Sequence, residues 1–291
     1  MTTYTRVAAV TGANKGVGLA IVRQLALQYP QSSYNNGPLL IYLTARNEER
    51  GKTALDTIKQ DPQLKSAKAL RSHGGLADIK YLPLDIDSQQ SIKDFASAVK
   101  EENPDGIDFL INNAGVALDG FDKDVVKKTL HCNYFGTLEA TQLLLPHIRD
   151  GGRLVNVASM AGHLDSRYSS TIRSRFLNAK QPEEITQLME DFISAVSNGT
   201  HDKEWPSVAY SVSKAGVIGM TKAFAQVNSQ VGSKTLINSC CPGWVKTDMT
   251  KGRGYKTPDE GAQTPVLLAL GDIKGSNGEF WQHEKIIKWE K

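Results

Sequence analysis

Two side chains in the second half of the chain have the spacing of a proton-transfer pair. Tyr210 and Lys214 lie in a segment that opens a run of helical periodicity, so positions i and i+4 share one face. Tyrosine titrates at about pH 10 in water, and a nearby ammonium favours the phenolate and brings the pKa toward neutrality. The pair therefore predicts a proton donor for a carbonyl oxygen, although such a spacing also occurs by chance in many helices.

A serine at the end of an apolar segment is the third candidate. Ser159 directly follows residues 154–158, which we expect to form a buried strand. Ligands of open α/β sheets bind at the carboxyl ends of the strands. Ser159 is therefore expected to hydrogen-bond the same carbonyl oxygen.

A glycine-rich turn follows the first apolar run, residues 7–10, with a helix beginning inside it. Glycine lets the backbone approach a pyrophosphate, and the free N–H groups at a helix start attract the anion. An ordinary strand-to-helix turn is the alternative, and the position after the first strand favours a dinucleotide. The predicted contacts are Gly12, Asn14, Lys15, Gly16, Val17 and Gly18.

The end of the second expected strand, residues 39–44, indicates which dinucleotide binds. An acid there would hydrogen-bond a free ribose 2′-hydroxyl and repel a 2′-phosphate. This chain instead has Arg46, whose guanidinium can hold a phosphate, and Lys15 can add a second charge. A solvated surface arginine is the alternative for Arg46. We predict NADPH/NADP+ as the cofactor.

The elements that must position these groups alternate along the chain. Segments of helical periodicity separate short apolar runs at 7–10, 39–44, 79–84, 109–111, 154–158 and 236–240. This order predicts an α/β fold, a Rossmann-type doubly wound parallel sheet with helices on both faces.

Three segments look like additions to this core: residues 30–38, 62–78 and, between Ser159 and Tyr210, about 163–206. The last carries a helical apolar stripe of its own, formed by Ile185, Leu188, Met189, Phe192, Ile193 and Val196. We expect a single domain over 1–291 with a helical insertion before the tyrosine. We expect this insertion, which lies between Ser159 and Tyr210, 51 positions apart, to dock along the neighbouring helices, with a mobile lid as the alternative, and we predict a monomer.

Composition excludes several other classes. The 291 residues carry a formal net charge of +3 with no long basic run, so nucleic acid is not an expected partner. The three cysteines and six histidines show no metal-ligand spacing, so no metal is predicted. No apolar stretch reaches the roughly 18 residues that span a bilayer, and no leader is evident at the start. We expect no membrane partner and a cytoplasmic protein.

Five motifs together resemble the short-chain dehydrogenase/reductase family over essentially the full length. The glycine turn, Asn112-Asn113-Ala114-Gly115, Ser159, the Tyr/Lys pair and Pro242-Gly243 stand in that family's order. Residues 11–23, 84–87, 133–137 and 240–249 further resemble its monomeric NADPH-dependent carbonyl reductases.

The resemblance implies roles for individual residues. Tyr210 is implied as general acid, Lys214 as the group that lowers its pKa and holds the nicotinamide ribose, and Ser159 as the group that polarises the carbonyl. Asn133 is implied to anchor a water in a proton relay. Further implied cofactor contacts are Asp85, Ile86, Asn113, Ala114, Gly115, Pro242, Gly243, Val245 and Thr247.

The substrate side is less defined by the sequence. Met160 and Trp244 flank catalytic elements and are expected to wall a pocket, with core packing as the alternative. Residues 116–120 depart from the segment that lines the pocket mouth in the relatives, which argues against glutathione conjugates as substrates. The expected reaction is NADPH-dependent reduction of aldehyde, ketone or quinone carbonyls. The alternatives are a dedicated alcohol, steroid or monoterpenoid-ketone oxidoreductase and a non-catalytic NADP(H) sensor.

Overall fold

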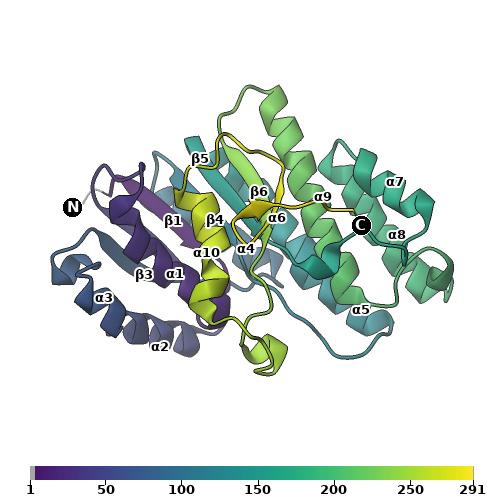
Figure 1. Cartoon of the computed structure of the whole chain (residues 1–291), viewed down its shortest axis with the longest axis horizontal. Helices are drawn as coiled ribbons and strands as arrows, with labels where there is room; N and C mark the ends of the chain where they lie inside the picture. The colour runs from purple at the N-terminus through teal and green to yellow at the C-terminus, as the bar shows by residue number, and fades with distance from the viewer. Residues whose placement is uncertain (1–3, 291) are drawn as a thin grey trace.

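One eight-stranded sheet runs through the computed structural model, which describes residues 4–290 (Figure 1). The strand order is β3-β2-β1-β4-β5-β6-β7-β8, with β7 and β8 antiparallel and the other neighbours parallel. The strands are β1 Arg6–Val10, β2 Leu39–Ala45, β3 Ala77–Pro83, β4 Ile107–Asn112, β5 Ile148–Val157, β6 Leu236–Cys241, β7 Phe280–Gln282 and β8 Lys285–Ile286.

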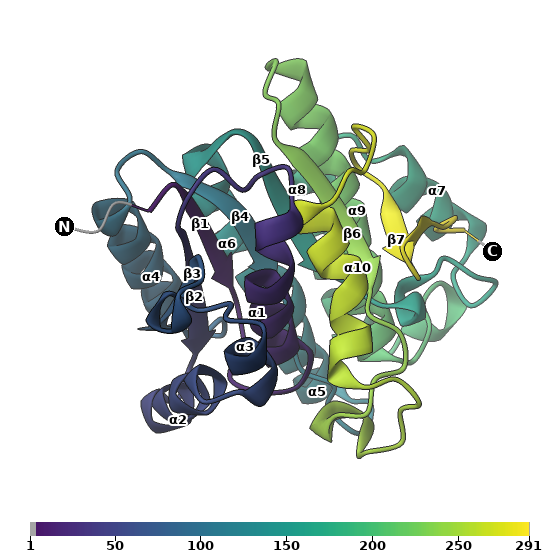
Figure 2. The same ribbon diagram turned by 60° about the vertical axis from the view of Figure 1, so that its left-hand side comes forward.

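Helices cover both faces of this sheet. They are α1 Gly16–Gln28, α2 Glu48–Lys59, α3 Pro62–Ser66, α4 Gln89–Glu102, α5 Lys123–Leu130, α6 Thr137–Leu144, α7 Ser170–Asn178, α8 Pro182–Ser197, α9 Ala209–Gln230 and α10 Pro258–Leu270. Ile21 of α1 and Val266 of α10 belong to one hydrophobic core, and Phe95 of α4 and Ile218 of α9 to the other. Figure 2 shows α1 and α10 side by side on the first of these faces. The predicted Rossmann-type doubly wound fold is confirmed.

Two of the parallel strands are buried along their whole length, as the continuous apolar runs predicted. Every residue of β2 and β4 is buried. The ends differ from the prediction in two places. β3 starts at Ala77, inside the expected loop 62–78, because Ala77 pairs with Leu39. β5 starts at Ile148, before a register shift opposite Ile107 that hides the strand pattern in the sequence.

Several short elements are not visible in the sequence patterns. α3 and a 3₁₀ turn, Arg71–His73, occupy the segment 62–78 that we expected to be an addition to the core. β7 and β8 are three and two residues long, too short for a period-2 pattern to be visible. Asp61 caps α3 by accepting from the Gln63 and Leu64 N–H groups.

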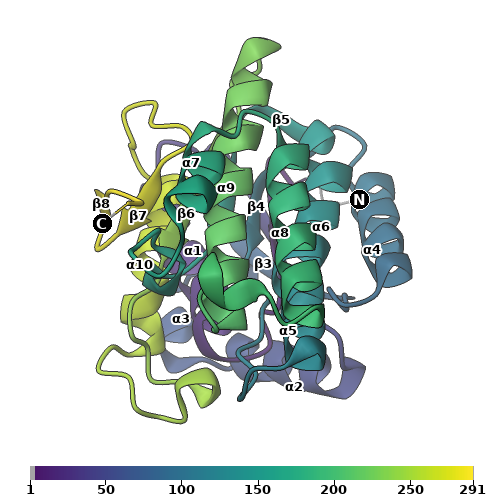
Figure 3. The same ribbon diagram turned by 90° about the vertical axis from the view of Figure 1, so that its right-hand side faces the viewer.

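The insertion is helical, as predicted, and consists of α7 and α8. Ile185, Leu188, Met189 and Phe192 on α8 are buried, whereas the last two residues of the expected stripe are partly buried. α8 packs against α5 and α9 on the outside of the second face (Figure 3). Within residues 4–290, no helix has the length and apolarity to cross a membrane.

Candidate active site

The carboxyl ends of β1, β4, β5 and β6 bring the predicted polar groups to one edge of the sheet. Tyr210 stands in the first turn of α9 and Lys214 in the next turn, where its Nζ donates to the Val157 carbonyl at 2.8 Å. Ser159 follows β5 and caps a short 3₁₀ turn, Met160–Gly162. Its hydroxyl is hydrogen-bonded to the Tyr210 hydroxyl. The structure therefore brings these three side chains together.

The glycine turn is shaped by close approaches that exclude a side chain. Gly12 has a φ of +61°, and a Cβ there would lie 2.8 Å from the Ala114 Cα. At Gly18 a Cβ would lie 2.4 Å from the Gly12 carbonyl oxygen and 2.5 Å from the Asn113 Nδ2. The turn is thus a tight cradle at the start of α1, packed closely against Asn113 and Ala114.

The Asn-Asn-Ala-Gly segment locks onto this cradle. Asn113 donates from Nδ2 to the Thr11 and Gly12 carbonyls at 3.0 and 3.1 Å. The Thr11 hydroxyl accepts from the Asn113 and Ala114 N–H groups, each at 2.9 Å. Thr11 is buried and was missed by the sequence analysis, although its place in the TGxxxGxG motif was the available signal.

The second strand is tied to the same cradle. The Thr44 hydroxyl accepts from the Gly12 N–H at 3.2 Å, and Arg46 follows two residues later with an exposed side chain. Lys15, the residue before α1, is also exposed, and its ammonium lies 2.6 Å from the Asp248 carboxylate. This contact lowers the pKa of Asp248. Arg46 and Lys15 thus flank the turn, and the Lys15–Asp248 ion pair was not foreseen.

The segment after β6 closes the opposite side of the cradle. A Cβ on Gly16 would lie 3.3 Å from the Thr247 side chain. The N–H of Lys246 donates to the Lys256 carbonyl, so this segment forms a hairpin-like loop. Lys251 in the same loop pairs with Asp119 at 2.9 Å, which links the loop to the segment after β4.

Burial controls the ionisation of the Tyr/Lys pair. It raises the pKa of Tyr210 to about 12, and the hydrogen bond from Ser159 opposes part of this rise. Burial also lowers the pKa of Lys214 to about 8. The expectation that Lys214 lowers the pKa of Tyr210 is therefore wrong for the protein's own groups. The ammonium is held by Val157 and lies 5.8 Å from the centre of the tyrosine ring, so desolvation dominates.

Asn133 lies in a π-helical turn, His131–Gly136, between α5 and α6. Its side chain accepts from the Val116 N–H at 2.7 Å and donates to the Val116 carbonyl and the Ser213 hydroxyl at 2.9 and 3.0 Å. Ser213 in turn donates to the Tyr210 carbonyl. Asn133 thus connects the loop after β4 to the first turn of α9. Ser213, inside the Tyr/Lys segment, was missed by the sequence analysis.

Asp85 and Ile86 follow β3 beside this π-helical turn. Asp85 accepts from the Asp87 N–H, and Ile86 packs so closely that a Cβ on Gly136 would lie 2.0 Å from its carbonyl oxygen. Both residues lie at the same edge of the sheet as the cradle, beyond the ends of β1 and β4.

The two residues expected to line a substrate pocket are both at least partly exposed. Trp244 is 55% exposed, and Met160 is partly buried with its Sδ 3.2 Å from the His163 Nε2.

Cys132, Cys240 and Cys241 are all buried, and the pKa of each thiol is raised, with burial the main cause. Cys240 and Cys241 pack in the two hydrophobic cores. In the described part of the chain, no group of three His, Cys, Asp or Glu side chains could hold a metal ion.

Comparisons with known proteins agree with this arrangement. Residues 6–171 and 191–257 match the family model of the short chain dehydrogenases. The sequence is 37% identical over 294 residues to carbonyl reductase (NADPH) 1 of Bos taurus, covering 97% of this chain and 98% of that protein. It is 36% identical over 300 residues to the Homo sapiens protein of the same name, covering 99% and 100%.

Solved structures show the same fold. Salutaridine reductase from Papaver somniferum has a TM-score of 0.78 and 26% identity, covering 95% of this chain and 99% of that one. Menthone neomenthol reductase from Mentha piperita has a TM-score of 0.74 and 23% identity, covering 96% and 98%. The chain belongs to the short-chain dehydrogenase family and is an oxidoreductase. The residues skipped by the family model, 172–190, lie within the insertion.

Proposed function

We propose that the protein is an NADPH-dependent carbonyl reductase that transfers hydride to aldehyde, ketone or quinone carbonyls. The observation that carries this proposal is the convergence of three side chains from two elements. Tyr210 is hydrogen-bonded to Ser159, and Lys214 stands one turn further along the same helix face. The names of the relatives from Bos taurus and Homo sapiens support the same reaction.

The cradle beside these groups fits the cofactor. Its backbone N–H groups at the start of α1 would hold the pyrophosphate. Arg46 and Lys15 would hold the 2′-phosphate of NADPH, which requires Lys15 to leave Asp248. Asp85, Ile86, Asn113 and the segment 242–247 would enclose the remainder. When bound, the nicotinamide supplies the hydride.

Each side chain has a distinct task in this proposal. The Tyr210 hydroxyl donates its proton to the carbonyl oxygen as negative charge develops there. Ser159 hydrogen-bonds the same oxygen and favours its charged form. The Lys214 ammonium, held 2.8 Å from the Val157 carbonyl, compensates the charge left on the tyrosine and would hold the nicotinamide ribose of a bound cofactor. Asn133 keeps the loop at Val116 and the start of α9 in register and anchors a relay water.

NADPH oxidation in the presence of an aldehyde, an aryl ketone and a quinone tests the proposal. The purified chain should oxidise NADPH only when a carbonyl is present and should form the corresponding alcohol or hydroquinone. Tight binding of NADPH without turnover on any carbonyl would instead identify a cofactor sensor. Absence of NADPH binding would contradict both.

A dedicated reductase for one large ketone is the second candidate. The similarity to salutaridine reductase, at 26% identity and a TM-score of 0.78, favours it. The exposed Trp244, Met249 and Tyr255 in the loop after β6 also leave apolar surface for such a ligand. A kcat/KM for one bulky ketone far above those for all small carbonyls would select this candidate.

The remaining parts of the proposal concern assembly. We infer that the chain folds as one domain and acts in the cytoplasm. We also infer that it is a monomer, because α8 buries its apolar stripe on α5 and α9. Burial of that stripe contributes several kcal/mol at about 25 cal/mol per Å². Light scattering should give a mass near 31.8 kDa. A mass of twice that value contradicts the monomer.

A further inference from the structure

The end of the described chain folds back onto the turn that carries Ser159. We call residues 159–162 the serine turn. The indole Nε1 of Trp289 donates to the Gly162 carbonyl at 2.8 Å, and Trp289 is only 6% exposed. The Leu164 N–H donates to the Trp289 carbonyl at 3.1 Å, and Leu164 pairs with Glu290 as a parallel bridge. Both the side chain and the backbone of Trp289 therefore hold this segment.

The serine turn itself is pressed against the start of α9. A Cβ on Gly162 would lie 2.6 Å from the Lys214 carbonyl carbon and 2.8 Å from the Ala215 nitrogen. The Gly162 N–H donates to the Ser159 carbonyl at 2.9 Å, so Gly162 and Ser159 belong to one tight turn. A displacement of Gly162 away from α9 would therefore carry Ser159 with it.

The ring of Trp289 extends the same contact along α9 and into the insertion. A Cβ on Gly219 would lie 3.2 Å from its Cη2 atom, so the indole lies directly on α9. Phe176 of α7 packs edge-on against it, with ring centres 5.8 Å apart. One buried side chain thus contacts the serine turn, the helix of Tyr210 and the insertion.

We propose that Trp289 is a positioning residue that fixes the distance between Ser159 and Tyr210. These two hydroxyls come from elements 51 positions apart in the sequence, and their spacing depends on how the serine turn seats on α9. The indole N–H holds the serine turn through its hydrogen bond to the Gly162 carbonyl. The contact of the ring with Gly219 fixes how closely the turn approaches α9. The proposal rests on the proposed carbonyl reduction, in which both hydroxyls meet one oxygen atom.

The test compares Trp289→Phe with Trp205→Phe. Trp205 is a matched control because it is equally buried and packs in the same aromatic cluster, against Phe176 and Phe192, away from the serine turn. Trp289→Phe should lower kcat about tenfold, because small misplacements of reacting groups reduce rates strongly. Its NADPH dissociation constant should stay within about twofold, and its primary deuterium isotope effect should rise. Trp205→Phe should keep kcat within about twofold.

A second readout does not depend on turnover. Met160 follows Ser159, and its methyl resonance can be assigned by Met160→Leu among the five methionines of a ¹³C-methyl-labelled protein. Trp289→Phe should shift this resonance, and Trp205→Phe should leave it in place. If wild type reduces no carbonyl, the proposed function fails while this measurement still tests the seating of the turn.

Two results would overturn the proposal. One is an equal loss of kcat in the two tryptophan variants, and the other is a Met160 resonance that Trp289→Phe does not move. If Trp289→Phe does not fold, Gly219→Ala in an Ile185→Val background replaces it, with Ile185→Val alone as the control. A Cβ on Gly219 would lie 3.2 Å from the indole Cη2, and Ile185→Val removes the Cδ1 atom that would lie closer, at 2.8 Å. Gly219→Ala should lower kcat and shift Met160 in the same directions, and unchanged values would overturn the proposal.

Discussion

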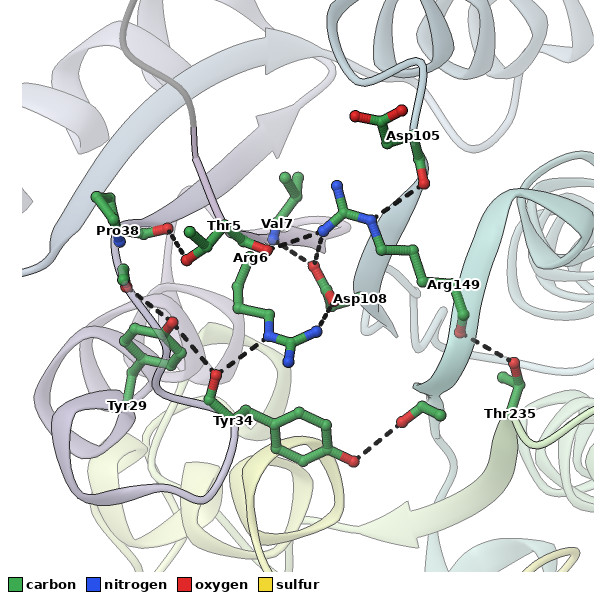
Figure 4. A network of polar contacts seen from close by, with 12 residues as sticks. Thr5, Arg6, Val7, Tyr29, Tyr34, Pro38, Asp105, Asp108, Arg149 and Thr235 are labelled. Carbon is green, nitrogen blue, oxygen red and sulfur yellow. Dashed lines mark hydrogen bonds and ion pairs between the residues drawn. The ribbon is translucent and has the colours of Figure 1, made fainter.

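The two edges of the central sheet differ in whether their buried ionisable groups are paired with opposite charges. At the amino edge, Asp108 of β4 is almost completely buried and accepts from Arg6 at 2.7 Å, Arg149 at 2.9 Å and the Val7 N–H at 2.8 Å (Figure 4). Both of its oxygens face full or partial positive charge. Tyr34, from the segment 30–38, accepts a hydrogen bond from the Arg6 Nε with its carbonyl, and the Arg6 guanidinium lies over the Tyr34 ring.

At the carboxyl edge the buried ionisable groups have no opposite charge of comparable strength. The Lys214 ammonium is held by a backbone carbonyl, and the Tyr210 hydroxyl by Ser159. Their pKa values move in opposite directions, to about 8 and about 12, because burial disfavours the charged form of each. The paired charges at the amino edge therefore stabilise the fold, whereas the carboxyl edge holds groups that can transfer a proton.

The largest expected effect is on turnover. Tyr210→Phe should lower kcat for carbonyl reduction by about 10³-fold or more, because it removes the proton donor and little packing. NADPH affinity, measured by fluorescence titration, should change little. Tyr168→Phe is the control, since the Tyr168 hydroxyl is buried without a hydrogen-bond partner and is assigned no part in the proton transfer. A Tyr210→Phe protein with most of its turnover refutes the assigned mechanism.

The next effect is on stability at the other edge. Asp108→Ala should lower the free energy of unfolding by about 3–5 kcal/mol, because it leaves two arginines without their buried partner. Urea denaturation measures this loss, and kcat at low temperature should persist. Asp150→Ala, which removes an exposed partner of Lys234 near the same edge, should cost less than about 1 kcal/mol. Equal losses in the two variants would show that Asp108 is not a stabilising centre.

A third experiment exchanges the sign of a charge beside the cradle. Arg46→Asp should weaken NADPH binding by about 2–4 kcal/mol and NADH binding much less, because only NADPH brings a 2′-phosphate. Lys93→Asp on α4 makes the same change in net charge at another exposed site. Dissociation constants for both cofactors check the difference. A wild type that binds NADH as tightly as NADPH would contradict the assignment of Arg46 and Lys15.

The smallest expected effect is on how the free energy of unfolding depends on pH. Because the folded protein lowers the pKa of Lys214 from 10.5 to about 8, the unfolded chain binds more protons between these values. The buried ammonium therefore destabilises the fold fully below about pH 8, and this penalty vanishes as the pH rises toward 10.5. Lys214→Met should be more stable than wild type at pH 7 by about 2–3 kcal/mol, yet inactive. Chemical denaturation at several pH values should show the gain shrinking above pH 8, and a constant or absent gain would contradict the buried-charge account.

The sequence was sufficient for what local patterns encode. The strands, the glycine turn and the stripe on α8 each carry a signal within a few residues, so their positions could be predicted. The Arg6–Asp108 pair and the bond from Trp289 to Gly162 join residues more than 100 positions apart. Such contacts depend on strand register and chain path. The pKa of Tyr210 was predicted in the wrong direction because spacing reveals the neighbouring lysine but not the desolvation that outweighs it.

The π-helical turn His131–Gly136 has a consequence for changes in chain length. Residues 123–144 form one continuous helical path in which this turn holds more residues per revolution than the α-helix on either side. A deletion of one residue there would restore α-helical geometry and redirect the side chains of the turn itself, while α6 would keep nearly its present orientation because the turn already accommodates one extra residue. Asn133 would then lose its contacts with Val116 and Ser213, so this stretch should not tolerate single deletions.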